Sequence, residues 1–64
     1  MNIKWYVIFQ CKDQNGVNSR FGVECNSKGD ALNAENEIKI RFDVTYSRVC
    51  CHPDKSSFNL IKLD

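Results

Sequence analysis

Residues 9–25, FQCKDQNGVNSRFGVEC, contain the strongest structural signal in the chain. At the centre of this stretch, Asn15-Gly16 stands between two segments in which apolar and polar residues alternate, as they do in a β-strand with one buried face. Asn-Gly in that position is a strong signal for a β-hairpin. The two strands are expected over Ile3–Cys11 and Arg20–Cys25.

Two loop geometries compete for this hairpin, and they differ in register by one residue. A two-residue turn at Asn15-Gly16 places Phe21 beside Gln10 and divides the apolar residues between the two faces. A three-residue loop over residues 14–16, with Gly16 in the left-handed conformation, gathers the large apolar residues on one face. Its pairs are Phe9 with Phe21, Val7 with Val23 and Trp5 with Cys25. The three-residue loop is therefore the favoured prediction.

A helix is predicted to follow the hairpin. Ser27 can cap its N-terminus, and Asp30 stands three residues further on, as in a weak capping box. Ala31, Ala34, Ile38 and Phe42 recur at helical spacing and would lie over the apolar face of the hairpin. Residues 38–46, IKIRFDVTY, also alternate with period two, which would start a strand at about residue 37. The good helix formers over 31–39 favour a helix that continues to about Arg41.

The remaining third of the chain predicts two more strands. Val44–Cys51 is rich in β-branched and aromatic residues, HPDKSS at 52–57 is typical of a turn, and FNLIKL at 58–63 predicts a last short strand. The expected fold is a single α+β domain over residues 1–64. It consists of an antiparallel β-sheet with one helix packed on one face, in the order β-β-α-β-β.

Composition restricts the function classes without selecting one. A chain of 64 residues has a thin core, and its nine basic and eight acidic residues give a net charge of +1. This balance is typical of neither a basic nucleic-acid binder nor an acidic mimic of DNA. The opening MNIKWYVIFQ is too short for a signal sequence or a membrane span. A cytoplasmic location and no membrane partner are expected.

The sequence VCCHPD at 49–54 raises the question of a metal or redox site, since Cys50, Cys51 and His52 are all zinc-ligand types. Adjacent strand residues point to opposite faces, so this spacing does not bring two thiolates to one ion. Cys11 and Cys25 lie too far apart along the hairpin to form a disulfide. The three glycines match no phosphate-binding motif, and His52 has only turn residues around it. We expect no cofactor, no metal and no enzymatic activity.

Surface contacts are the remaining source of function. A single helix covers one face of the sheet, so the other face should expose a Tyr-Ile pair ringed by polar residues, as in a protein contact patch. A second candidate is a basic cluster that could meet phosphates. The residues predicted to bind a partner are Lys4, Tyr6 and Ile8 on the open face and Lys39, Arg41 and Arg48 in the basic cluster.

The strand WYVIF, the strand end GVEC and the helix start SKGDALNAENEI give the chain a resemblance to small phage-encoded proteins. It resembles in particular some anti-CRISPR inhibitors of type I surveillance complexes. Antitoxins of the HicB type share the strand hairpin followed by an Ala-rich helix, but they normally have a further strand before that helix. The resemblance implies a non-enzymatic plug that blocks nucleic-acid entry into a host nucleoprotein complex.

The leading hypothesis is therefore a small protein-interaction module that acts as a phage or mobile-element inhibitor. Its partner would be a protein or ribonucleoprotein complex of the host. The alternative is a small nucleic-acid-binding or antitoxin-like regulatory protein, and a zinc- or thiol-dependent protein is a third class. So thin a sheet is also expected to favour a homodimer formed by edge-to-edge pairing.

Overall fold

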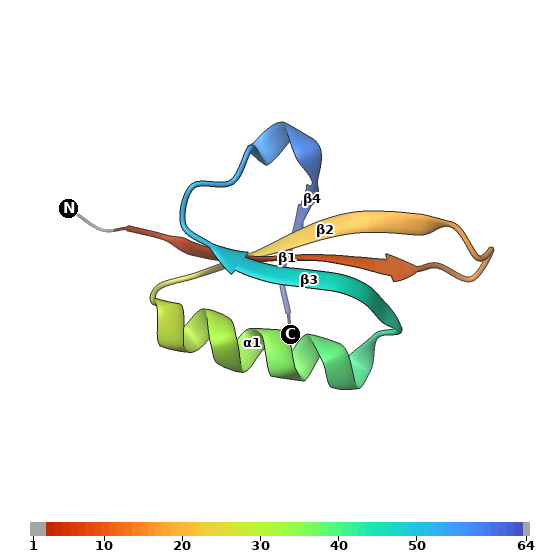
Figure 1. The fold of residues 1–64 in the computed structure, drawn as a ribbon, viewed down its shortest axis with the longest axis horizontal. Coiled ribbons are helices and arrows are strands. Elements are labelled where there is room, and N and C mark those ends of the chain that lie inside the picture. The colour runs from red at the N-terminus through yellow and green to blue at the C-terminus, as the bar shows by residue number, and fades with distance from the viewer. Residues whose placement is uncertain (1–2, 64) are drawn as a thin grey trace.

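The computed structural model describes residues 3–63, which form one helix packed against a four-stranded sheet (Figure 1). The elements are β1 (Trp5–Lys12), β2 (Asn18–Cys25), α1 (Lys28–Arg41), β3 (Val44–Cys50), the short 3₁₀ helix η1 (Lys55–Ser57) and β4 (Asn59–Ile61). The sheet order is β3-β1-β2-β4. The predicted α+β class and the order β-β-α-β-β are confirmed.

The hairpin has the predicted three-residue loop. The Asp13 N–H donates to the Val17 carbonyl at 3.0 Å, and Gly16 adopts a φ of +78°. The Asp13 carboxylate also accepts the backbone N–H groups of Asn15 and Val17, which stiffens the loop. The register is the predicted one, with Phe9 opposite Phe21, Val7 opposite Val23 and Trp5 opposite Cys25. Figure 1 shows the hairpin projecting past the end of α1.

The helix begins and ends as predicted. The Ser27 hydroxyl accepts the Asp30 N–H at 3.1 Å, and the last helical bond runs from the Phe42 N–H to the Ile38 carbonyl. Ala31 and Ile38 are fully buried against the sheet. Ile40 is 82% exposed, because the helical period turns it away from the face that carries Ile38. The alternating pattern that begins at Ile38 therefore does not form a strand until β3 starts at Val44.

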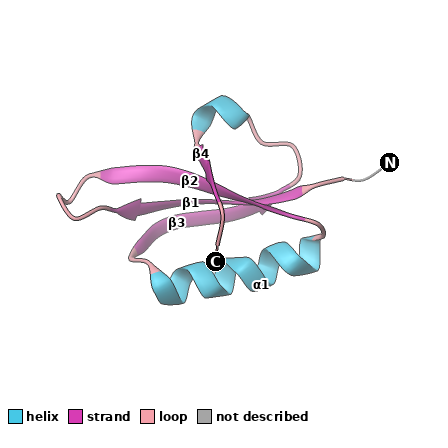
Figure 2. Cartoon of the chain, turned by 180° about the vertical axis from the view of Figure 1, so that it is seen from behind, coloured by secondary structure: helices cyan, strands magenta, loops and turns pink. Residues whose placement is uncertain are grey.

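The sheet is mostly antiparallel, as predicted, and its short fourth strand makes it mixed. β1 pairs antiparallel with both β2 and β3, so β2 and β3 run in the same direction. After β3 the chain crosses the sheet through η1, on the face opposite α1, and then descends along β2 (Figure 2). β4 therefore pairs parallel with β2, with Gly22 opposite Leu60.

That crossing creates a second small core on the face of the sheet away from α1, called here the outer face. Tyr6, Ile8 and Phe58 form this core, and Tyr6 and Ile8 are each only 3% exposed. The prediction that Tyr6 and Ile8 are an exposed pair is wrong, because the Phe58 ring covers them. Gly22 makes room for the ring: a Cβ at Gly22 would lie 2.2 Å from Phe58 Cε2.

Candidate interaction site

The outer face carries a groove of about 360 Å³ beside the buried Tyr6, and we call it the outer-face groove. The start of the chain forms one wall, and the segment between β3 and η1 forms the other. Its lining residues are Ile3, Lys4, Tyr6, Cys51, His52, Pro53 and Lys55. Two of the predicted contact residues, Lys4 and Tyr6, therefore meet here, whereas Ile8 lies beneath Phe58 and takes no part.

Hydrogen bonds and charge hold the floor of this groove in place. The Tyr6 hydroxyl donates to Glu24 Oε2 at 2.9 Å, and Lys55 Nζ lies 5.4 Å from the centre of the Tyr6 ring. The pKa of Lys55 is raised, chiefly by its hydrogen-bonding interaction with Tyr6 and further by attraction to Glu24. Lys55 thus keeps its charge at neutral pH. On the opposite wall, Lys4 Nζ donates to Asn26 Oδ1 at 2.8 Å.

The groove is cationic at short range. Lys4 and Lys55 give it this charge, and none of its described lining residues is a carboxylate. The nearby Asp54 carboxylate accepts both the backbone N–H and the hydroxyl of Ser56, and these two bonds lower its pKa. Glu24 is likewise engaged by the Tyr6 hydroxyl. An anionic group entering the groove would meet the Lys4 and Lys55 ammonium groups, with apolar Ile3 and Pro53 beside them.

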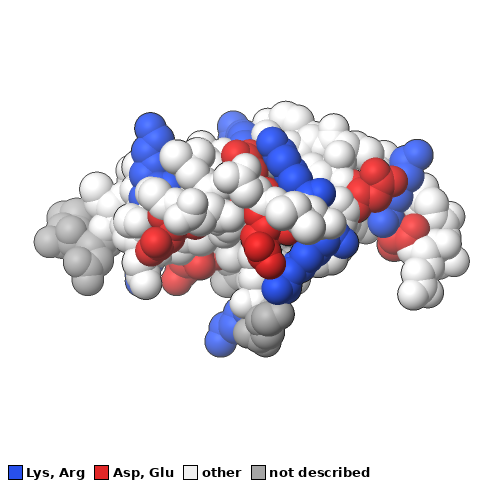
Figure 3. Space-filling model, turned by 90° about the horizontal axis from the view of Figure 1, so that it is seen from below, with Lys and Arg blue, Asp and Glu red and all other residues white. Residues whose placement is uncertain are grey.

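The predicted basic cluster is divided by the sheet. Arg48 lies opposite Ile8 on β3 and so projects from the outer face, whereas Lys39 and Arg41 lie on α1 beneath the other face. Arg41 also forms an ion pair with Glu37, Nε to Oε1 at 3.0 Å. On the helix side, acidic and basic side chains interleave (Figure 3). The prediction that these three residues form one basic surface is wrong.

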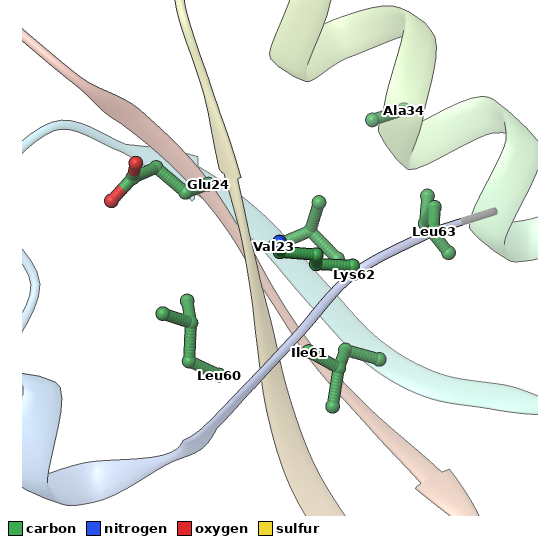
Figure 4. Close-up of a pocket in the computed structure, with 7 residues that line it drawn as sticks. All are labelled: Val23, Glu24, Ala34, Leu60, Ile61, Lys62 and Leu63. Atoms are coloured by element: carbon green, nitrogen blue, oxygen red, sulfur yellow. The ribbon is translucent and has the colours of Figure 1, made fainter.

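A second hollow, of about 400 Å³, lies where the C-terminal segment leaves β2. Figure 4 shows the C-terminal segment running beside β2, with Glu24 and Leu60 next to its first part and Leu63 next to the helix that carries Ala34. Leu63 and Ile61 pack against the core under α1. This arrangement anchors the chain and presents few polar groups to a ligand.

All four cysteines are free thiols. Burial raises the pKa of the Cys11 thiol, with smaller contributions from Asp13 and Asp43, and burial likewise raises that of Cys25. Within residues 3–63, no group of three or more His, Cys, Asp and Glu side chains could hold a metal ion. No helix in this part of the chain has the length and apolar character needed to cross a bilayer.

Comparison of the chain with protein-family models, with curated protein sequences and with solved structures finds no match in any of the three. The site therefore rests on its own geometry.

His52 and Lys55 line the groove although the sequence does not predict it, because the segment between the last two strands has the composition of a plain turn. One signal could have found them. Gly22 interrupts an otherwise regular strand, and a glycine inside a strand often marks the close approach of another group. Together with the uncovered Tyr6 and Ile8, it indicates that an aromatic residue from elsewhere must lie there. Phe58 is that residue, and covering the pair brings His52 and Lys55 to Tyr6.

Proposed function

We propose that this chain is a non-enzymatic protein-interaction module whose outer-face groove binds an acidic segment of a partner protein. The observation that carries the proposal is the convergence of Lys4, His52 and Lys55 on one groove, with Lys55 Nζ over the Tyr6 ring. Interaction surfaces are enriched in aromatic residues, and charge complementarity selects and orients a partner. A carboxylate would contact the two ammonium groups, and its neighbouring apolar side chain would pack on Ile3 and Pro53.

Charge distribution favours a protein partner over a nucleic acid. A nucleic-acid surface normally needs a track of cations that follows several phosphates. The groove supplies two lysines and a histidine, and the helix side of the molecule mixes both signs of charge (Figure 3). A phage inhibitor of a host nucleoprotein complex is one form of such a module, and it stays a prediction from the sequence resemblance.

The experiment compares two labelled probes: a glutamate-rich peptide with one aromatic residue, and a single-stranded oligonucleotide of equal charge. Binding is measured by fluorescence anisotropy, and the contact is mapped by amide chemical shifts. We expect the peptide to shift the signals of Lys4 and Lys55 and of their neighbours. Lys4→Glu combined with Lys55→Glu should weaken peptide binding about tenfold or more, because two attractive contacts become repulsive.

The matched control is Lys12→Glu combined with Lys62→Glu, which changes the net charge equally at exposed positions away from the groove. We expect it to keep most of the affinity. An equal loss in both double variants would show that net charge, not the groove, drives binding. Tighter binding of the oligonucleotide, with a steep dependence on salt, would support the nucleic-acid alternative instead.

A further inference from the structure

The outer edge of β3 is a long strand edge without a neighbour among residues 3–63. β3 pairs there with β1 alone, and in Figure 1 it lies in front of β1 with no other element over it. Natural proteins protect such edges with lysine, proline, bulges or very short strands. β4, at the other edge, has three residues. β3 has seven, VTYSRVC, with neither proline nor lysine and with Arg48 as the single charge; its pairing with β1 is irregular only at Thr45, an extra residue between Val44 and Tyr46, and is regular over residues 46–50.

The backbone groups that this edge presents follow from the hairpin. The bond from the Asp13 N–H to the Val17 carbonyl shows that odd-numbered residues of the first strand direct their backbone groups toward β2. The even-numbered residues therefore bond to β3. Their partners are Tyr46 opposite Gln10, Arg48 opposite Ile8 and Cys50 opposite Tyr6. The N–H and C=O groups of Ser47 and Val49 consequently point away from the sheet, along the open edge.

Apolar side chains flank this edge on both faces of the sheet. Tyr46 projects from the outer face and is 44% exposed. Beneath the sheet, the Ser47 hydroxyl donates to Glu35 Oε2 at 2.8 Å, which fixes the flank of α1 nearest β3. Leu32 stands three residues before Glu35 on that flank and is 46% exposed. An unpaired backbone edge between two exposed apolar residues has the composition of an interface.

We propose that β3 pairs antiparallel with β3 of a second copy of this chain, with Ser47 opposite Ser47 of that copy. The two Ser47 residues then exchange backbone hydrogen bonds across a two-fold axis perpendicular to the sheet. In this register, Tyr46 of each copy lies directly opposite Arg48 of the other, an aromatic-cation pair on one face. The edge is thus complementary to itself.

Neighbouring registers lack this complementarity. Moving the axis to Arg48 sets the two guanidinium groups directly opposite each other, and like charges in that position destabilise a strand pair. Moving it to Tyr46 pairs the two tyrosines and leaves both Arg48 side chains without the facing ring. The pairing centred on Ser47 is the arrangement that satisfies both residues in both copies.

The contact is small. A seven-residue strand is roughly 23 Å long, and an edge pairing of that length belongs among the smaller protein interfaces. We therefore expect a dissociation constant in the micromolar range. The full chain should be followed by sedimentation velocity from about 1 µM to 1 mM, with circular dichroism to confirm that each variant is folded.

Substitutions that alter the charges at Tyr46 and Arg48 test the proposed register of the β3 pairing. Tyr46→Lys places a lysine opposite Arg48, and Arg48→Glu removes the cation that faces Tyr46, so each should weaken the dimer about fivefold or more. The double variant Tyr46→Lys with Arg48→Glu sets the introduced lysine opposite the introduced glutamate and should restore the dimer. The matched control is Arg20→Glu, on the same face but on β2, and it should dimerise like the native chain.

Amide hydrogen exchange gives a second readout that needs no variant. The Ser47 amide should exchange quickly in dilute protein and slowly in concentrated protein, whereas the Arg48 amide, bonded to β1, should be protected in both. A native chain that stays monomeric at 1 mM would overturn the proposal. So would a double variant that fails to recover, an Arg20→Glu variant that dissociates as readily as Arg48→Glu, or a Ser47 amide whose exchange ignores concentration.

Discussion

Replacing Gly22 with alanine should displace the Phe58 ring from the outer face and destabilise the fold. The added Cβ would lie 2.2 and 2.3 Å from two carbons of the Phe58 ring, whereas ordinary contact begins at about 3.4 Å. The ring would have to withdraw by more than about 1 Å. Tight packing leaves it little room to do so, since Phe58 is 9% exposed and Tyr6 and Ile8 beneath it are 3% exposed. The expected consequence is displacement of Phe58 from the outer core.

Two contributions set the expected loss of stability: the lost burial of the Phe58 ring and the gain from replacing a glycine inside a strand. Complete loss of a buried phenylalanine ring costs about 3–5 kcal/mol, and alanine is about 0.5–1 kcal/mol better than glycine inside a strand. We expect Gly22→Ala to lower the free energy of unfolding by roughly 2–4 kcal/mol. For a chain of 64 residues, whose total stability should be about 3–10 kcal/mol, that is a large fraction. At about 4–8 °C per kcal/mol for a domain of this size, the corresponding fall in Tm is roughly 8–32 °C.

Urea denaturation followed by circular dichroism measures this directly. The matched control is Gly29→Ala, where the nearest heavy atom to the new Cβ is Ser27 Oγ at 3.9 Å, and helix propensity predicts a gain of up to about 1 kcal/mol. A double-mutant cycle with Phe58→Ala isolates the collision, because Gly22→Ala should cost nothing once the ring is gone. A Gly22→Ala protein as stable as the native one, or a loss of stability that persists without Phe58, would show that Gly22 is not needed to seat the ring.

Three further perturbations have definite expected outcomes. Gly16→Ala forces a side chain into the left-handed conformation and should cost about 1–2 kcal/mol in urea denaturation, with Gly16→Asn milder. Ser27→Ala removes the acceptor of the Asp30 N–H and should cost about 1 kcal/mol, which Ser27→Asp should restore. Burial raises the pKa of the Cys11 and Cys25 thiols above the ordinary value of 9.0. Their contribution to stability is therefore complete below pH 9 and lost as pH rises through the folded-state pKa. A thermal denaturation series across that range should show the loss, and replacing both cysteines with alanine should reduce it.

The parts of the fold that local interactions determine could be predicted from the sequence. The hairpin register follows from Gly16 and from the need to put Phe9 and Phe21 on one face. The helix start follows from Ser27, whose hydroxyl accepts a bond three residues away. In both places the interacting residues are close along the chain or face each other across one turn. The sequence pattern alone is therefore enough to predict the hairpin register and the helix start.

The outer face could not be predicted in the same way, because its cover comes from the opposite end of the chain. Tyr6 and Ile8 look like exposed residues until Phe58 is placed on Gly22. The parallel pairing of β4 has the same origin, since the crossing through η1 sets its direction. For the same reason only some of the groove residues could be predicted. Lys4 and Tyr6 lie at the start of the hairpin, whereas His52 and Lys55 lie in the segment that crosses the sheet.

The proposed groove and the proposed β3 pairing have a joint consequence. Pairing about an axis perpendicular to the sheet keeps both outer faces on the same side, so the dimer presents two outer-face grooves to one partner. A ligand with two acidic segments would occupy the second groove intramolecularly, at an effective concentration set by the linker between the segments. Its affinity should therefore fall in Arg48→Glu, although Arg48 is not among the residues that line the groove. A single acidic segment should bind Arg48→Glu and native protein with the same affinity. The comparison therefore distinguishes an effect on dimer formation from an effect on binding in the groove.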